Sequence, residues 1–354
     1  MNALENGTAL RPPLPGTTVT EGQEIGAQRD RSGETMKRGT LLAAKVAVSL
    51  ALLGYLLSTA DLPALVRRVR EGDVLLLAAG VGLYAAMLAL STWRWRLLLA
   101  AQGFPASLRA LSASYLIATF FNNFLPSNIG GDVVRVRDSS KLTGSTTTSL
   151  AVVAIDRILG LSALYALAFA AFVLGGSGVR HLAGARVVLL GLGLVFVGLA
   201  YIYFRPGIAR RLMAVSGLAA RSWAQTRFEV VQSAVHVYRD RISAVAIALL
   251  ASLALQTIVV LYYWAVAHAL RIPLPLGACF LMVPLCTLVQ TVPVSFNGWG
   301  VRESVFIVYF NQVGLSRDSA LAFSLVGAGL IVLLSLSGAV VWTSRRGVSG
   351  DAEA

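Results

Sequence analysis

The chain has 354 residues, of which 56% are hydrophobic and 13% are charged, and its mean hydropathy is +0.72. This composition is typical of a polytopic membrane protein and not of a soluble domain. The net charge of +13 suggests nucleic-acid binding at first sight. The basic residues, however, lie in short loops between apolar runs, which is the pattern that orients membrane helices. We therefore expect the membrane bilayer as a partner and no nucleic acid.

The N-terminal residues 1–39 are rich in Gly, Pro, Thr, Glu and Arg and lack periodicity, which predicts a disordered cytoplasmic tail. The first apolar run begins near Thr40 and is long enough to anchor the chain, so we expect no cleavable signal peptide. Most runs approach the roughly 20 residues that a spanning helix needs. They lie at 40–59, 74–93, 108–125, 147–175, 187–204, 242–269, 276–296, 301–313 and 317–342.

The distribution of arginines selects among the possible topologies. If the N-terminus is inside and every run crosses the membrane, the segment 205–241 and its seven arginines would face outward. The conflict disappears if 108–125 and the residues after Gly131 form a re-entrant hairpin, and 276–313 forms a second one entered from the other side. Arg67, Arg68 and Arg70 remain as an exception on the outer side.

The fold class that follows is all-α: a transmembrane domain over 40–342 with about six spanning helices and two re-entrant hairpins. Two related hairpins inserted from opposite faces predict an inverted repeat. Both termini, including a short tail at 343–354, are expected in the cytoplasm of a cell (plasma) membrane protein. Positions 137 and 221 should then lie inside and position 180 outside. Within 205–241, apolar residues at helical spacing among the arginines predict a basic amphipathic helix on the inner leaflet, or alternatively a solvated linker helix.

Two proline-to-arginine segments, 126–135 and 293–302, interrupt the apolar runs. Aligned on their prolines, both have a glycine five residues on and an arginine nine residues on. Proline and clustered glycines break a membrane helix, and such breaks are tolerated where they line a cavity or are buried in protein. Paired breaks in the two halves therefore predict a binding site.

Gly131 and Gly300 are each expected to begin a short helix whose N-terminus points into the membrane interior. Exposed N–H groups and the helix dipole favour an anion there. Arg135 and Arg302, early in these helices, would complete two cationic pockets suited to phosphate, because the guanidinium fork binds its oxygens bidentately. The alternative is that acidic residues in the first turns cap these helices and pair with the arginines; these residues are Asp132 and Glu303.

Asp156 and Arg157 lie deep within the 147–175 run, where each charge costs roughly 2.5–3.5 kcal/mol, so both need partners. Adjacent helical residues do not face each other, so we expect the two to pair elsewhere. The network could bind a ligand, or it could only fasten the hairpins to the bundle. The candidate partners are Arg135 or Arg302 for Asp156, and Asp132 or Glu303 for Arg157.

Other polar residues are ambiguous. Asn122, Asn123, Asn128 and Asn297 could contact a ligand or satisfy backbone groups that the breaks leave unpaired. The sequence Trp93-Arg94-Trp95-Arg96 is interpreted as an interfacial anchor that follows a span. Three scattered histidines and two cysteines within one apolar run give no metal-ligand spacing, so we expect neither a metal nor a cofactor.

Together, the segment 125–135, the pair Asp156-Arg157 and the segment 297–303 resemble the flippase-like membrane family that includes the transmembrane region of lysylphosphatidylglycerol synthases. The resemblance covers about residues 40–342. It implies a polytopic bundle that moves or handles a lipid, with relatives in aminoacyl-lipid, glycan and hopanoid pathways. Because the sequence ends at Ala354, we expect no soluble aminoacyl-transfer domain and carry over no synthase activity.

The leading hypothesis is a translocator, or flippase, for an anionic membrane lipid that bears a phosphate. The first alternative is a membrane-embedded lipid-modifying transferase. The hairpins offer Asp132, Asp156 and Glu303 but no His or Cys, which disfavours an enzyme and leaves no catalytic residue to assign. The second alternative is an accessory subunit of a lipid- or glycan-modifying enzyme, which would then be a partner.

Overall fold

A computed structural model describes residues 47–59, 61–125, 130–175, 184–204, 211, 238, 240–291 and 295–350. The regular elements in these ranges are helices, so the predicted all-α class is confirmed. Four helices within these ranges are long and apolar enough to cross a membrane. They are α3 (Val74–Ala101), α6 (Thr146–Leu174), α11 (Ile242–Ala269) and α14 (Arg317–Gly350), whose apolar span is Arg317–Arg345.

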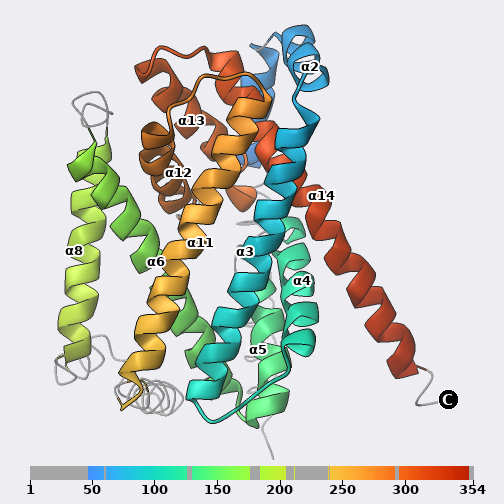
Figure 1. Cartoon of the computed structure of the whole chain (residues 1–354), viewed down its shortest axis with the longest axis vertical. Coiled ribbons are helices and arrows are strands. Elements are labelled where there is room, and N and C mark those ends of the chain that lie inside the picture. Colours follow the sequence, from blue (N-terminus) through green and yellow to red (C-terminus); the bar gives the residue numbers. More distant parts are fainter. Residues whose placement is uncertain are drawn as a thin grey trace, which may run out of the picture. The chain divides into compact units, whose positions relative to one another are not determined.

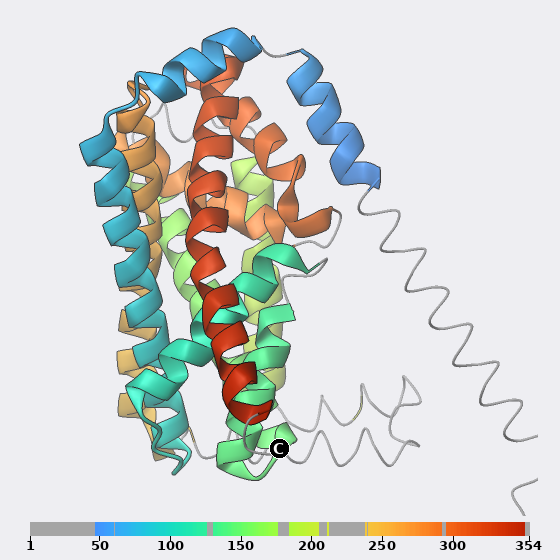
Figure 2. The same ribbon diagram turned by 90° about the vertical axis from the view of Figure 1, so that its right-hand side faces the viewer.

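Shorter apolar helices occur at two of the other predicted spans. The Ala47–Ser58 helix corresponds to the run 40–59, and α8 (Ala185–Phe204) corresponds to the run 187–204. Between the first of these and α3, the short helix α2 (Leu62–Arg70) lies across one end of the bundle (Figure 2). Asp73 begins α3 because its carboxylate accepts hydrogen bonds from the N–H groups of Leu75 and Leu76.

The first hairpin consists of α4 (Leu108–Phe124) and α5 (Gly130–Thr143), which pack against each other (Figure 1). It enters the bundle at the end where α3 finishes, which we call the first-hairpin end. The hairpin is tight at Gly131, where a Cβ atom would clash with the carbonyl oxygen of Ala118 and the side chain of Asn122. The N–H of Gly131 donates to Oδ1 of Asn122 at 2.8 Å. Glycine is therefore required where the two arms meet.

The second hairpin consists of α12 (Leu276–Gln290), the 3₁₀ turn η2 (Phe296–Gly298) and α13 (Val301–Gln312). It enters from the opposite end of the bundle, where α11 finishes and α14 begins (Figure 1). The chain reverses through left-handed backbone conformations at Asn297, Gly298 and Gly300, with φ values of 48°, 77° and 82°. The two hairpins thus enter from opposite ends, as the arginine distribution predicted.

Two helices extend further than expected. α3 continues past residue 93 to Ala101, because the apolar residues Leu97, Leu98 and Leu99 prolong the run beyond the Trp-Arg repeat. The repeat therefore lies inside a helix, and its interpretation as an anchor after a span is wrong for Arg94 and Trp95, which are buried. α14 continues to Gly350, beyond its expected end at 342. The tail 1–39, nearly all of 205–241, position 180 and Asn128 lie outside the described residues.

Candidate functional site: an alternating charge chain beside a cavity

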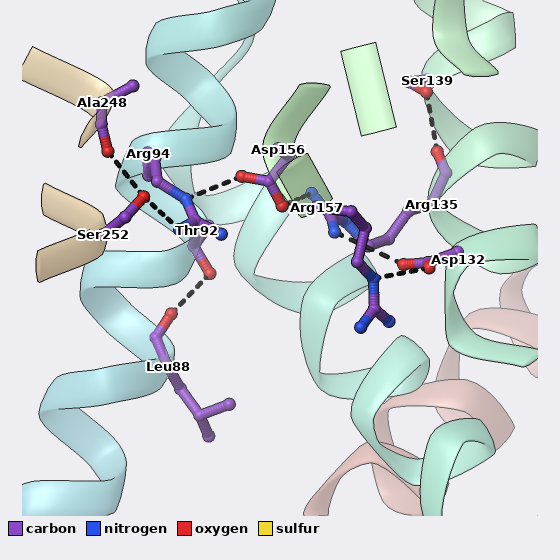
Figure 3. Close-up of polar contacts among 10 residues, drawn as sticks. All are labelled: Leu88, Thr92, Arg94, Asp132, Arg135, Ser139, Asp156, Arg157, Ala248 and Ser252. Carbon is purple, nitrogen blue, oxygen red and sulfur yellow. Dashed lines mark hydrogen bonds and ion pairs between the residues drawn. The ribbon is translucent and has the colours of Figure 1, made fainter. Parts of the chain in front are cut away.

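Five charged side chains from three helices form a chain of alternating sign (Figure 3). Nε of Arg94 on α3 lies 2.7 Å from Oδ1 of Asp156 on α6. Oδ2 of Asp156 lies 2.9 Å from Nη2 of Arg135 on α5. Arg135 lies 3.5 Å from Oδ1 of Asp132, whose Oδ2 lies 2.7 Å from Nε of Arg157 on α6. This set of five side chains, which we call the charge chain, contains three cations and two carboxylates, so it carries one excess positive charge.

Burial differs strongly along this charge chain. The side chains of Asp156, Arg135 and Arg94 are 2%, 4% and 8% exposed, whereas that of Arg157 is 46% exposed. Both oxygens of Asp156 accept hydrogen bonds from arginines, and Arg94 also donates to Oγ of Ser252 on α11 at 2.6 Å. Buried charges persist when they are paired and hydrogen-bonded in this way. The Arg94 end is thus fixed among four helices, and the Arg157 end is accessible.

Arg135 also lies between two aromatic rings. Its guanidinium carbon is 4.7 Å from the centroid of Trp95 and 5.1 Å from that of Tyr115. Cation–π attraction of this kind is worth about 2 kcal/mol when the cation is desolvated. Its Nε makes no hydrogen bond to any part of the chain that the structure describes. Arg135 is therefore held by aromatic faces and carboxylates while one donor is left over.

A cavity of about 300 Å³ opens beside the charge chain, and all five charged residues line it. Both hairpins contribute to its wall, the first through α4 and α5 and the second through α12. The hydrocarbon portion of the wall includes Met87, Leu88 and Leu161. Its neutral polar residues are Tyr115, Thr119 and Asn122 from α4, Gln256 from α11, Thr287 from α12, and Thr291, which directly follows α12.

The arginine of the second hairpin is paired locally. Nη2 of Arg302 lies 2.6 Å from Oε1 of the adjacent Glu303, and Nε donates to Oγ of Ser324 on α14 at 3.0 Å. The guanidinium also lies 4.7 Å from the ring centroid of Trp299, which parallels the Arg135–Trp95 contact. Oε2 of Glu303 accepts from the N–H of Gly300 at 2.6 Å and so caps α13. The expected capping by an acidic residue is thus present in the second hairpin.

Each of the two intramembrane charges therefore binds one of its two candidate partners. Asp156 binds Arg135, as one of the two alternatives predicted, but its second partner is Arg94 and not Arg302. Arg157 binds Asp132 and not Glu303. Arg302, the other candidate partner of Asp156, lies outside this network, because Glu303 neutralises it within the second hairpin.

The asparagines and glycines of the two breaks serve the backbone in this structure. Asn123 donates to the carbonyl oxygen of Thr119 at 3.1 Å, inside α4. Asn297 occupies the left-handed turn that precedes α13. At Gly300 a Cβ atom would lie 2.5 Å from Cβ of Leu52, so the Ala47–Ser58 helix approaches the second break closely. The backbone N–H groups of Gly131 and Gly300 are both already bonded to side chains.

Several residues of the site were not expected from the sequence. Arg94 had a usable signal, since the apolar residues that follow it place it within a span, where a charge requires a partner. Ser252, Gln256, Thr287 and Thr291 gave none, because single hydroxyl and amide side chains are common in membrane helices. They become part of the site only through the way in which α11 and α12 pack.

Comparison with known proteins agrees with the architecture. Residues 42–338 match the family model described as the lysylphosphatidylglycerol synthase TM region. No curated protein matches the sequence. The matched segment includes both hairpins, the charge chain and the helices that position them. This chain therefore belongs to the family of the lysylphosphatidylglycerol synthase transmembrane region.

Proposed function

We propose that the chain translocates an anionic, phosphate-bearing lipid between the leaflets of a cell membrane, with the head group passing through the cavity between the hairpins. The observation that carries this proposal is the charge balance of the cavity wall, in which three arginines face two aspartates. One excess cation in a low-dielectric setting favours an anionic occupant. The volume of about 300 Å³ suits a head group, while acyl chains would remain among the apolar helices.

Arg157 is the first contact in this proposal, because it is the most exposed member of the charge chain. It shares Asp132 with Arg135. A phosphate that enters the cavity competes with Asp132 for both guanidinium groups, which bind phosphate oxygens in the same forked geometry as a carboxylate. Exchange of one anion for another keeps both arginines paired at every stage. The two arginines therefore do not become uncompensated buried cations when the lipid phosphate enters.

Asp156 keeps Arg135 in position while the exchange takes place. Its second bond, to Arg94, connects the first hairpin to α3, and Arg94 is in turn fastened to α11 through Ser252. The head group thus meets a cation whose place is set by three membrane helices. Preorganisation of this kind reduces the ordering that binding would otherwise require.

Arg302 occupies the equivalent place in the second hairpin, and we assign it the same task when the bundle faces the other leaflet. Its present partner Glu303 then corresponds to Asp132, as the carboxylate that the phosphate replaces. Two broken hairpins inserted from opposite sides are the arrangement in which repeats exchange roles during alternating access. We further propose that the first-hairpin end faces the cytoplasm, where most of the basic loops would lie.

The proposal is tested with purified full-length protein in phosphatidylcholine vesicles that contain fluorescent phosphatidylglycerol or fluorescent phosphatidylcholine. A membrane-impermeant reductant destroys the fluorophore in the outer leaflet only. We expect the protein to expose the inner-leaflet phosphatidylglycerol to reduction faster than the inner-leaflet phosphatidylcholine. Equal rates for the two lipids, or rates equal to protein-free vesicles for all anionic lipids tried, would contradict the proposed activity.

A further inference from the structure

A second cavity lies on the other side of the first hairpin. It has a volume of about 490 Å³ and is lined by residues of α4, α5 and α14. Asp132 and Arg135 on α5 face the first cavity, whereas Arg137, Asp138 and Lys141 on the same helix line the second. α5 therefore separates two cavities, and the proposed translocation site uses only one of them.

The second cavity is strongly basic. Arg137, Lys141 and Arg345 line it together with one carboxylate, that of Asp138. Arg345 is fixed in place, with Nη1 lying 3.1 Å from Oδ2 of Asp138 and Nη2 donating to the carbonyl oxygen of Ala110 at 3.0 Å. Ser114 donates to the same oxygen of Asp138 and so fixes the carboxylate. Among the described residues of this wall, the only acidic group is thus already committed to one of the three cations.

Arg137 and Lys141 are four residues apart on α5, so both project from one face of the helix. Both residues are exposed, and neither forms an ion pair with any residue that the structure describes. Like charges at this spacing destabilise a helix by a few tenths of a kcal/mol. An anion held between them would remove this repulsion, and Arg345 would supply a third cation beside it.

The remaining wall of the second cavity is apolar and aromatic. Phe121 of α4 and Trp342 of α14 meet edge to face, with ring centroids 5.6 Å apart. Trp342 precedes Arg345 by about one helical turn, at the very end of the apolar span Arg317–Arg345. Tryptophan followed by arginine at the end of a span marks the level of the lipid head groups. The cavity therefore offers cations at head-group depth and an apolar wall beside them.

We propose that this second cavity binds an anionic phospholipid of the leaflet at the first-hairpin end. The phosphate lies between Arg137 and Lys141, with Arg345 as the third cation. The first part of the acyl chains lies against Phe121 and Trp342. Basic pockets between membrane helices bind anionic head groups by this combination of charge and apolar contact. The site is independent of the proposed translocation, since no residue is shared between the two cavities.

Trp342 provides a direct reporter, because bromine atoms on a lipid acyl chain quench a tryptophan only at short range. The full-length protein is reconstituted in phosphatidylcholine vesicles containing either brominated phosphatidylglycerol or brominated phosphatidylcholine. The signal of Trp342 is the difference between the parent protein and Trp342→Phe. We expect the same degree of quenching to need a several-fold lower mole fraction of brominated phosphatidylglycerol than of brominated phosphatidylcholine.

The key variant is Arg137→Gln/Lys141→Gln, tested with and without Trp342→Phe. Each basic residue near an anionic lipid is worth about a fivefold preference, so the double variant should lose most of the selectivity. Arg109→Gln/Arg241→Gln is the matched control, since it removes two exposed arginines at the same end that do not line the cavity. It should retain the preference. If the double variant fails to fold, Lys141→Gln alone, at the exposed end of α5, takes its place. This single variant should lose about a fivefold preference for phosphatidylglycerol.

Three results would overturn the proposal. The parent protein could show equal quenching of Trp342 by the two brominated lipids. The matched control could lose as much selectivity as the Arg137→Gln/Lys141→Gln variant, which would indicate general surface charge. Finally, millimolar glycerol phosphate could abolish the selective quenching, which would show a site for a soluble phosphate compound and not for a phospholipid.

Discussion

Oδ2 of Asp156 on α6 accepts a hydrogen bond from Nη2 of Arg135 on α5 at 2.9 Å, and this contact connects the first hairpin to a membrane-spanning helix. The other oxygen of Asp156 binds Arg94 on α3. A single carboxylate thus fixes the position of the hairpin relative to two spans. Any movement of α5 that accompanies lipid passage must either carry α6 along or exchange this bond for another.

Replacing Asp156 by Asn should be strongly destabilising. It leaves Arg94 and Arg135 buried without a full counter-charge, at a cost of about 3–5 kcal/mol. The measurement is thermal unfolding in detergent, supported by the yield of monodisperse protein. Asp138→Asn is the matched control, because the partly exposed Asp138–Arg345 pair should contribute only about 0–1 kcal/mol. A loss for Asp156→Asn no larger than for this control would contradict the assigned role.

The Arg135–Asp156 pair predicts that the effects of two substitutions on the unfolding free energy are not additive. Arg135→Gln combined with Asp156→Asn removes both charges, so the double variant should be less destabilised than the sum of the two single variants. The coupling is obtained from a double-mutant cycle of unfolding free energies. Strict additivity would mean that the two side chains act independently, despite the 2.9 Å contact.

Gly131→Ala should separate the arms of the first hairpin. The added Cβ would overlap the backbone oxygen of Ala118, which cannot move as a side chain can. Overpacking of this kind costs about 1–3 kcal/mol. Gly82→Ala in α3 is the control, since a Cβ there meets nothing within 4 Å and alanine favours a helix. Thermal unfolding that ranks the two variants equally would show that the close contact at Gly131 is not needed.

Arg302→Lys and Glu303→Gln distinguish two roles for the second hairpin. Glu303→Gln removes the counter-charge of Arg302 and weakens the cap on the Gly300 N–H, so it should lower stability by about 3–5 kcal/mol. Arg302→Lys keeps the charge but loses the planar fork. It should reduce lipid translocation more than it reduces the unfolding temperature. Equal proportional losses in both measurements would assign Arg302 to structure alone.

Accessibility labelling checks the orientation of the hairpins. Arg137→Cys on α5 and Arg271→Cys beyond α11 lie at opposite ends of the bundle (Figures 1 and 2). In a background where the buried Cys279 and Cys286 are replaced by Ala, an impermeant thiol reagent applied outside cells should modify only position 271. Position 221 should behave like 137, and position 180 like 271. External labelling at 137 would overturn the expected cytoplasmic location of the first-hairpin end.

Much of the fold could be predicted from the sequence because membrane helices are nearly continuous apolar runs. The run 242–269 coincides with α11 (Ile242–Ala269), and 108–125 ends one residue after α4 (Leu108–Phe124). The hairpins could be predicted because proline lacks the N–H that a helical hydrogen bond needs, and clustered glycines favour non-helical backbone conformations. The end of α3 could not be placed from hydropathy in the same way, since Arg94 and Arg96 interrupt the apolar run that Leu97 resumes.

For the candidate site, the sequence could predict only those residues whose type is unusual in its surroundings. Asp156 and Arg157 are conspicuous because ionised groups inside a span require partners. Which partners they find depends on the rotation of α3 and α5 about their own axes, and this is a property of packing. Arg302 illustrates the difference, since it matches Arg135 in motif position and yet binds Glu303, the residue next to it in the sequence.

The most direct measurement of the central claim is the rate of phosphatidylglycerol movement between leaflets for Arg157→Gln. This variant removes the exposed end of the charge chain and leaves the Arg94–Asp156–Arg135 core intact. A charge-assisted hydrogen bond is worth about 1.5–3 kcal/mol, so the rate should fall about tenfold or more while the unfolding temperature stays near that of the parent. Arg109→Gln, an exposed arginine that does not line the cavity, should move lipid at the parental rate. Parental rates for well-folded Arg157→Gln, Arg135→Ala and Arg302→Ala would contradict the claim and make the hairpins structural, as in an accessory subunit.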